Sequence, residues 1–109
     1  IDEVPTTVFA KNAYFMREEL GKINCNVIGV DWNMNPVTTR ELVGKDKVLQ
    51  GNLDPCMLYA PPAKIETETK NMIQMFGSKH IVNLGHGVYP DTPLDGVRAF
   101  VNTVKNYKY

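Results

Sequence analysis

The sequence repeats a strand-then-helix pattern four times, and this alternation limits the possible folds more than any other feature of the chain. Each expected strand is a short, continuous apolar or β-branched run, and the runs cover residues 6–10, 27–30, 48–53 and 80–82. Strands that alternate with helices favour a parallel sheet. Continuous apolar strands are typical of a sheet with both faces covered. The sequence therefore predicts an α/β fold of four βα units.

Capping residues mark where the first two helices should begin and end. Asn12 is expected to cap the first helix, on which three apolar residues fall at helical spacing. These residues are Met16, Leu20 and Ile23. Asn35 before Pro36 gives a cap with proline at the first helical position, and Gly44 is a suitable terminator.

The last two helices are predicted in the same way. One runs from about residue 63 to 76 and ends at Gly77. Its expected inward residues are Ile65, Met72, Ile73 and Phe76. The segment Thr92-Pro93-Leu94-Asp95 resembles a capping box with proline just inside the final helix. The apolar stripe on that helix, expected to face the core, consists of Val97, Phe100, Val101 and Val104.

The segment Asn-Leu-Gly-His-Gly-Val-Tyr-Pro-Asp (83–91) is the strongest functional signal. It places His86 between two glycines, Gly85 and Gly87, just after the fourth strand. Ligands of α/β proteins bind at the carboxyl ends of strands. Glycine on both sides leaves the imidazole uncovered. The alternative interpretation is a glycine-rich turn with an incidental histidine.

Polar residues also follow the other strands, and each has a structural alternative. Lys11 follows the first strand, where a charge has no obvious structural role. Asp31 follows the second strand, where it faces a ligand, caps the second helix or binds N–H groups of its own loop. After the third strand, Asn52 precedes Asp54-Pro55, which is most often a turn. Together these ends predict a polar site at one rim.

Composition narrows the class of protein. With 12 Lys+Arg against 12 Asp+Glu, the balance argues against a nucleic-acid surface or a membrane-binding helix. A length of 109 residues allows one domain at most, and no apolar run approaches a transmembrane helix. Cys25 and Cys56 match no metal or redox spacing and are expected to be free cytosolic thiols. Because residue 1 is Ile1 rather than methionine, we expect the chain to be a piece of a longer protein.

Several segments resemble, in order and spacing, the C-terminal part of the uroporphyrinogen decarboxylase family. They are Phe-Ala-Lys (9–11), Gly-Val-Asp-Trp (29–32), Val-Gly-Lys (43–45), Leu-Gln-Gly-Asn-Leu-Asp-Pro-Cys (49–56) and the segment 83–91. The resemblance implies a TIM (β/α)8 barrel, of which residues 1–109 would be the C-terminal half, strands five to eight. It further implies a cytoplasmic homodimer that decarboxylates the four acetate side chains of uroporphyrinogen, giving coproporphyrinogen in haem biosynthesis. No metal or organic cofactor is implied.

The resemblance carries one site residue onto this sequence. Among the family's substrate-binding residues, only the histidine of the Leu-Gly-His-Gly motif has a counterpart here, His86. The family's carboxylate-binding arginines, its aspartate, tyrosine and serine lie in the half that this chain lacks. The chain alone is therefore expected to be inactive. Further possible cleft-lining residues are Lys11, Asp31, Asn83, Gly85, Gly87 and Tyr89.

Two other functions fit parts of the sequence. Corrinoid- and zinc-dependent methyltransferases share the barrel, but they hold zinc with a His-x-Cys motif and a further cysteine. Here those places hold Phe-Ala-Lys (9–11) and His86, which argues against zinc. A small flavodoxin-like binding domain has about this length, with Asp31 as its acidic site. Such a domain needs further acidic residues after its first strand, where Lys11 lies instead.

Overall fold

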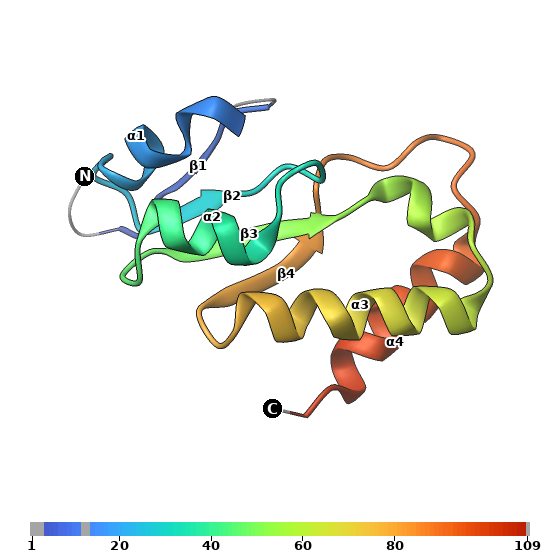
Figure 1. Cartoon of the computed structure of the whole chain (residues 1–109). Coiled ribbons are helices and arrows are strands. Elements are labelled where there is room, and N and C mark those ends of the chain that lie inside the picture. Colours follow the sequence, from blue (N-terminus) through green and yellow to red (C-terminus); the bar gives the residue numbers. More distant parts are fainter. Residues whose placement is uncertain (1–3, 12–13, 109) are drawn as a thin grey trace.

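The computed structural model describes residues 4–11 and 14–108, and within them strands and helices alternate as predicted (Figure 1). The elements are β1 (Thr7–Phe9), η1 (Tyr14–Met16), α1 (Arg17–Gly21), β2 (Val27–Gly29), α2 (Pro36–Val43), β3 (Val48–Leu53), η2 (Pro55–Tyr59), α3 (Pro62–Phe76), β4 (His80–Leu84) and α4 (Leu94–Asn106). The η elements are short 3-10 turns. None of the helices in this described part of the chain is long and apolar enough to cross a bilayer.

The strands form a parallel sheet in the order β1-β2-β3-β4, which confirms the predicted parallel arrangement. Each strand is paired with the next one along the chain. A flavodoxin-like sheet instead has its second strand at the edge, in the order 2-1-3-4-5. The observed order therefore excludes the flavodoxin-like interpretation. Sequential parallel order is the arrangement of strands around a (β/α)8 barrel.

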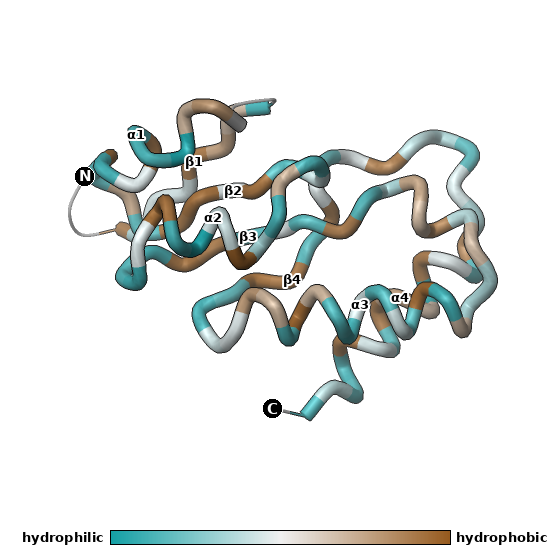
Figure 2. The backbone as a smooth tube through the Cα atoms, in the orientation of Figure 1, coloured by the Kyte–Doolittle hydropathy of each residue, from teal (hydrophilic) through white to brown (hydrophobic). Residues whose placement is uncertain are grey.

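The helices form one layer, in which α1 contacts α2, α2 contacts α3 and α3 contacts α4. Figure 2 shows hydrophobic segments along the strands and alternating hydrophobic and hydrophilic segments around the helices. The core lies between this layer and the sheet. Its centre includes Ile28 and Leu49 from the strands and Ile73 from α3, each 2% exposed or less.

The opposite face of the sheet is open. Phe9, Gly29, Gln50 and Ile81 are partners across the four strands and so share this face. Phe9 is 46% exposed and Ile81 is 45% exposed. The expectation that both faces are covered is therefore wrong for the described residues. The reason is geometric, because crossovers of one hand between sequential strands place all helices on the same side.

Several predicted helix ends are confirmed. Asn35 caps α2, since its side chain accepts a hydrogen bond from the Thr38 amide. Gly44 and Gly77 end α2 and α3 with φ angles of 107° and 79°, a region that glycine enters freely. The predicted cap Asn12 lies outside the described residues. Helix α1 is shorter than predicted. Met16 lies before its first residue and Ile23 after its last, and both side chains are at least 40% exposed.

The start of α4 differs from the prediction. Its N-cap is Pro93, and the Thr92 hydroxyl donates to the Tyr89 carbonyl instead of capping the helix. The buried residues of α4 are the small ones, Gly96 and Thr103. A β-carbon on Gly96 would lie 1.9 Å from the Leu58 carbonyl oxygen of η2. Of the predicted core stripe, Val97, Phe100 and Val104 are partly buried against the core, whereas Val101 is 41% exposed.

The amino-terminal edge of the sheet is held by two basic side chains. Arg40 donates to the backbone carbonyls of Gly44, Lys47 and Lys79, and so joins the end of α2 to the starts of β3 and β4. Lys47 donates to the carbonyls of Ile23 and Cys25 before β2. These groups bind backbone rather than ligand. The amino-terminal ends of β2, β3 and β4 are therefore held together by hydrogen bonds from these two side chains to the backbone.

Candidate functional site

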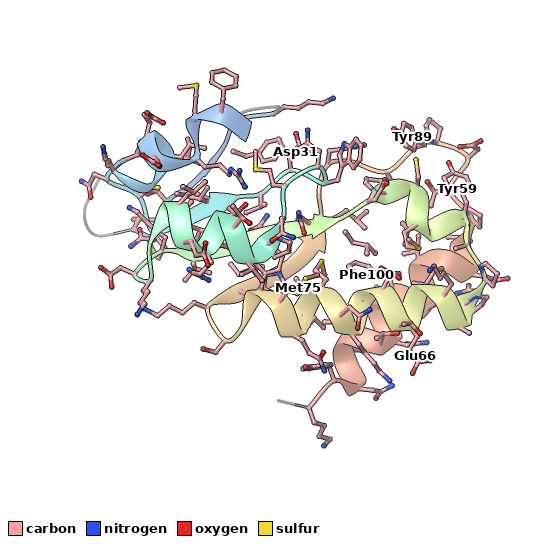
Figure 3. The ribbon with its side chains drawn as sticks, in the orientation of Figure 1. Asp31, Tyr59, Glu66, Met75, Tyr89 and Phe100 are labelled. Carbon is pink, nitrogen blue, oxygen red and sulfur yellow. The ribbon has the colours of Figure 1, made fainter. Side chains whose placement is uncertain are left out.

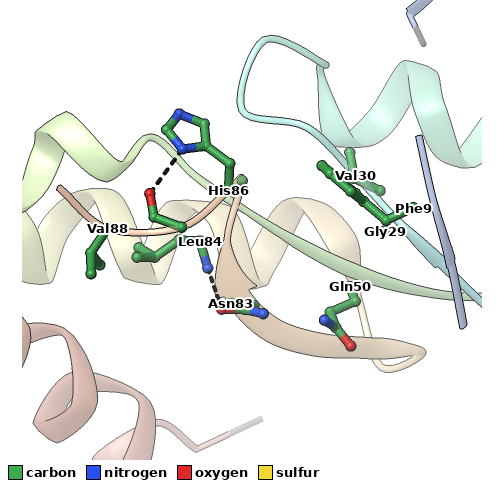
Figure 4. A pocket seen from close by; sticks show the side chains of 10 residues that line it. Phe9, Gly29, Val30, Gln50, Asn83, Leu84, His86 and Val88 are labelled. Carbon is green, nitrogen blue, oxygen red and sulfur yellow. Dashed lines mark hydrogen bonds between the residues drawn. The ribbon is translucent and has the colours of Figure 1, made fainter. Parts of the chain in front are cut away.

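An open pocket of about 390 Å³ lies at the carboxyl ends of the strands, the edge of the sheet at which the sequence predicts a ligand site (Figure 4). Residues from all four strands or the segments that follow them contribute to it. The lining residues are Phe9, Gly29, Val30, Gln50, Asn83, Leu84, Gly85, His86, Gly87 and Val88. Its wall on the β4 side is the beginning of the segment 83–91, which we call the rim segment.

The imidazole of His86 is half-buried, and its two nitrogens differ. Nδ1 lies 2.9 Å from the Gly87 carbonyl oxygen. Because a carbonyl oxygen only accepts, this contact requires a hydrogen on Nδ1. The His86 and Tyr89 rings also meet nearly at right angles, with ring centroids 5.8 Å apart. Nε2 makes no hydrogen bond within the described residues and is available to a ligand.

The rim segment is anchored at both ends. The Gly85 amide donates to the Leu53 carbonyl of β3 at 2.8 Å. A β-carbon on Gly85 would lie 2.4 Å from the Trp32 nitrogen, so only glycine fits between β4 and the turn after β2. At the other end the Tyr59 hydroxyl donates to Asp91. That hydrogen bond raises the pKa of Tyr59. His86 thus lies in a segment whose path is fixed on both sides.

The structure brings some of the predicted cleft-lining residues to the pocket and not others. Asn83, Gly85 and Gly87 line it together with His86. Lys11 is exposed after β1, outside the lining. Tyr89 is 43% exposed and lies outside the lining, with its ring against the His86 ring.

Asp31, in the segment after β2 (Figure 3), is buried and does not line the pocket. It is 0% exposed, and its carboxylate accepts a hydrogen bond from the Trp32 amide at 2.9 Å. This is the loop-binding role that the sequence left open for it. Asp54 likewise accepts from the Cys56 amide, as expected for a turn.

Sequence reasoning missed Phe9 and Gln50 as pocket residues. Both lie inside apolar strands read as continuous runs, in which the pattern does not separate one face from the other. Position in the strand carries a weak signal, because residues two apart share a face. Which face is open depends on where the helices pack, and that is a tertiary property.

The described residues hold no group of three or more His, Cys, Asp or Glu side chains placed to bind a metal ion. Cys25 is buried and Cys56 is exposed, and both are free. Neither cysteine lines the pocket.

Comparison with known proteins places these features in a family. Residues 1–107 match the family described as Uroporphyrinogen decarboxylase (URO-D). The uroporphyrinogen decarboxylase of Homo sapiens is 47% identical over 105 residues, which are 95% of this chain and 29% of that protein. The one of Christiangramia forsetii is 41% identical over 108 residues, 98% of this chain and 32% of that protein. The chain thus spans about a third of the length of these relatives.

Among solved structures, a methyltransferase from Methanosarcina mazei superposes with a TM-score of 0.80 at 23% identity. The match covers 93% of this chain and 31% of the methyltransferase. At that identity the likeness concerns the fold, and the four parallel βα units are part of a TIM barrel. The family match, the two relatives and the Leu-Gly-His-Gly rim lead to one conclusion: the chain belongs to the uroporphyrinogen decarboxylase family.

Proposed function

We propose that this chain is the C-terminal part of a uroporphyrinogen decarboxylase. Such an enzyme removes carbon dioxide from the four acetate side chains of uroporphyrinogen, leaving methyl groups and giving coproporphyrinogen in haem biosynthesis. The observation that carries the proposal is His86, which lines an open pocket at the carboxyl edge of a URO-D chain. Residues 1–109 would contribute four of the eight βα units of one barrel domain.

His86 is proposed to bind the substrate through Nε2. Since Nδ1 donates to Gly87, a neutral His86 presents only an acceptor at Nε2. To donate to a substrate carboxylate, the ring must therefore be protonated. The cationic ring would then form a charge-assisted hydrogen bond with an acetate or propionate group. We favour this role over proton transfer to carbon.

The substrate supplies the electron sink for the reaction. Protonation of a pyrrole α-carbon makes that ring cationic, and the acetate on the same ring then loses carbon dioxide as a β-imino acid does, its bonding electron pair moving into the ring. Protonation of the resulting methylene carbon and loss of the α-carbon proton give the methyl-substituted pyrrole. For this reason the proposed mechanism uses no metal or organic cofactor. The protein has to hold an octa-acid, place a proton donor and stabilise the cationic ring. Asn83 and Gln50 would line the floor beneath the macrocycle.

The remainder of the site belongs to the other half of the barrel. By the family resemblance, that half supplies the arginines that bind carboxylates and an aspartate facing the pyrrole N–H groups. We propose that the complete protein is a cytoplasmic homodimer. The methyltransferase alternative has the support of a shared fold alone, since its zinc would need thiolate ligands where Lys11 and His86 lie.

The test is turnover by a longer protein that carries this chain. Purified protein is incubated with enzymatically or chemically reduced uroporphyrinogen, and the products are oxidised and separated by carboxylate number. We expect coproporphyrin, with activity unchanged after treatment with a metal chelator. An absence of decarboxylation, or methyl transfer that requires zinc, would refute the proposal.

A further inference from the structure

Asn52 is a buried amide at the carboxyl end of β3 that points away from the pocket. Its Nδ2 donates to the carbonyl oxygens of Asp31 at 2.8 Å and Met34 at 2.7 Å. Both amide hydrogens are thereby used. The side chain is 6% exposed and is not part of the pocket lining. Asn52 therefore fixes the path of residues 31–34, which we call the rim turn.

The rim turn in turn fixes the start of the rim segment. The backbone of Trp32 lies against Gly85, where a β-carbon would approach the Trp32 nitrogen and Cα to 2.4 Å and 2.6 Å. His86 is the next residue. A displacement of Trp32 would therefore be transmitted to His86 through backbone contact, with no flexible side chain between them to absorb it.

A second close backbone approach, between Gly51 and Val30, brings Asn52 within reach of the rim turn. Gly51 has a φ of 139°, and a β-carbon there would lie 2.5 Å from the Val30 carbonyl oxygen. The backbones of β3 and β2 therefore come together immediately before Asn52. The backbone N–H of Asn52 also donates to the Met72 sulfur on α3, at 3.2 Å. Asn52 thus links the helix layer to the rim.

We propose that Asn52 is a positioning residue, which holds His86 at the pocket through the rim turn and Gly85. The inference rests on the proposed function for its catalytic readout and on the contacts above for its geometry. Asn52 acts on the reaction through His86 alone. Its removal should therefore lower the rate only while His86 is present.

A double-mutant cycle tests this in a longer protein that carries the chain. Asn52→Ala, His86→Ala and the double variant are compared by kcat/KM for uroporphyrinogen. A displacement of about 1 Å costs up to about 100-fold in rate, so we expect Asn52→Ala to lower kcat/KM by roughly 10- to 100-fold. In the His86→Ala background the same substitution should lower it by less than about threefold, because coupled residues are not additive.

Thr39→Val is the matched control. Thr39 is 1% exposed, and its hydroxyl accepts a hydrogen bond from Arg17 between α1 and α2, away from the pocket lining. Its removal loses a buried hydrogen bond as Asn52→Ala does. We expect its small effect on kcat/KM to be equal in both His86 backgrounds. Equal losses for Asn52→Ala in both backgrounds, or a loss no larger than that of Thr39→Val, would overturn the inference.

A measurement without substrate separates this inference from the proposed function. The imidazole C2–H resonance of His86, assigned by its disappearance in His86→Ala, should shift in Asn52→Ala and stay in place in Thr39→Val. If the protein does not decarboxylate uroporphyrinogen, this shift still supports positioning, and an unchanged resonance rejects it. Should Asn52→Ala fail to fold, Asn52→Ser, which keeps one donor for one of the two carbonyls, replaces it in both measurements.

Discussion

The two histidines of the chain lie at opposite ends of β4 in different surroundings. His80 begins the strand on the helix side, stacked on Phe76 with ring centroids 4.0 Å apart. Its Nε2 donates to the Gly51 carbonyl, while its Nδ1 is buried without a hydrogen-bond partner in the described part of the chain. His86 follows the strand, with Nε2 available to a ligand. The His80 ring packs against the core residue Phe76, and the His86 ring lines the pocket.

His86→Ala in a longer protein that carries the chain should leave folding nearly intact and reduce catalysis. The loss of one hydrogen bond to a charged group amounts to about 1.5 to 3 kcal/mol, or roughly 10- to 150-fold in kcat/KM. His86→Asn keeps a donor and should recover part of the loss. Steady-state kinetics and the accumulation of partly decarboxylated porphyrins measure both effects. Unfolding of the alanine variant, with full specific activity in the fraction that remains folded, would make His86 a structural residue.

The stability of the protein should depend on pH through His80. Burial lowers the pKa of His80 below its value of about 6.5 in the unfolded chain. The hydrogen bond to the Gly51 carbonyl offsets part of this decrease, and the Arg40 charge adds to it. As the pH falls below about 6.5, the unfolded chain therefore binds a proton that the folded chain refuses, and unfolding becomes easier. Above that pH the contribution of His80 is constant.

His80→Phe provides the comparison, because it keeps a ring on Phe76 and removes the titrating group. Urea unfolding at several pH values between about 7.5 and 5 should show a smaller decline in stability for the variant than for the parent protein. Equal declines in the two proteins would mean that His80 does not contribute to the pH dependence.

At the scale of elements, the docking of α4 depends on one glycine. Gly96 lies inside α4 against η2, where alanine would ordinarily favour the helix by about 1 kcal/mol. Here the added β-carbon would overlap the Leu58 carbonyl oxygen. We expect Gly96→Ala to destabilise the fold by about 1 to 3 kcal/mol, measured by thermal or urea unfolding. Gly87→Ala is the control, since nothing lies within 4 Å of its added carbon. Equal effects of the two substitutions would rule out the close contact.

The elements differ in how far the sequence alone predicts them. Strands and the ends of α2 and α3 follow from local chemistry, namely apolar runs, the Asn35 cap and the terminators Gly44 and Gly77. The short α1 and the start of α4 do not, because tertiary contacts override the local signal there. Ile23 fits a helical pattern yet lies past the helix end, and Thr92 turns its hydroxyl to Tyr89.

The residues of the candidate site also differ in whether local sequence or tertiary structure determines their position. His86 was predicted from its flanking glycines and its place after a strand, both of which are readable in sequence. Gln50 was not, because its exposure to the pocket depends on the face that the helices leave open. The role of Asn52 was also unreadable, since its partners, Asp31 and Met34, lie about 20 residues away in sequence.

At the scale of the molecule, β1 and β4 are the two edges of the sheet in the described residues, beside the open face that carries Phe9 and Ile81. Unpaired strand edges and exposed apolar surface favour association. The 109-residue chain, produced alone, should therefore form dimers or larger assemblies. Light scattering after size exclusion measures this, and a monomer that unfolds cooperatively would contradict it.

The same preparation should not decarboxylate uroporphyrinogen. Binding of the octa-acid is proposed to need the arginines of the other half of the barrel, and the pocket here offers His86 with neutral amides and apolar groups. The products are oxidised and separated by carboxylate number, as for the longer protein. Turnover at a rate comparable with that of the longer protein would show that the proposed division of the site is wrong.

The separation between the amino-terminal and carboxyl-terminal ends of the strands also matters for how such proteins diverge. Arg40 and Lys47 hold the amino edge through backbone carbonyls, which every sequence provides, so side chains at the other edge are free to be exchanged. A lineage can acquire a new reaction at the carboxyl edge without rebuilding its scaffold.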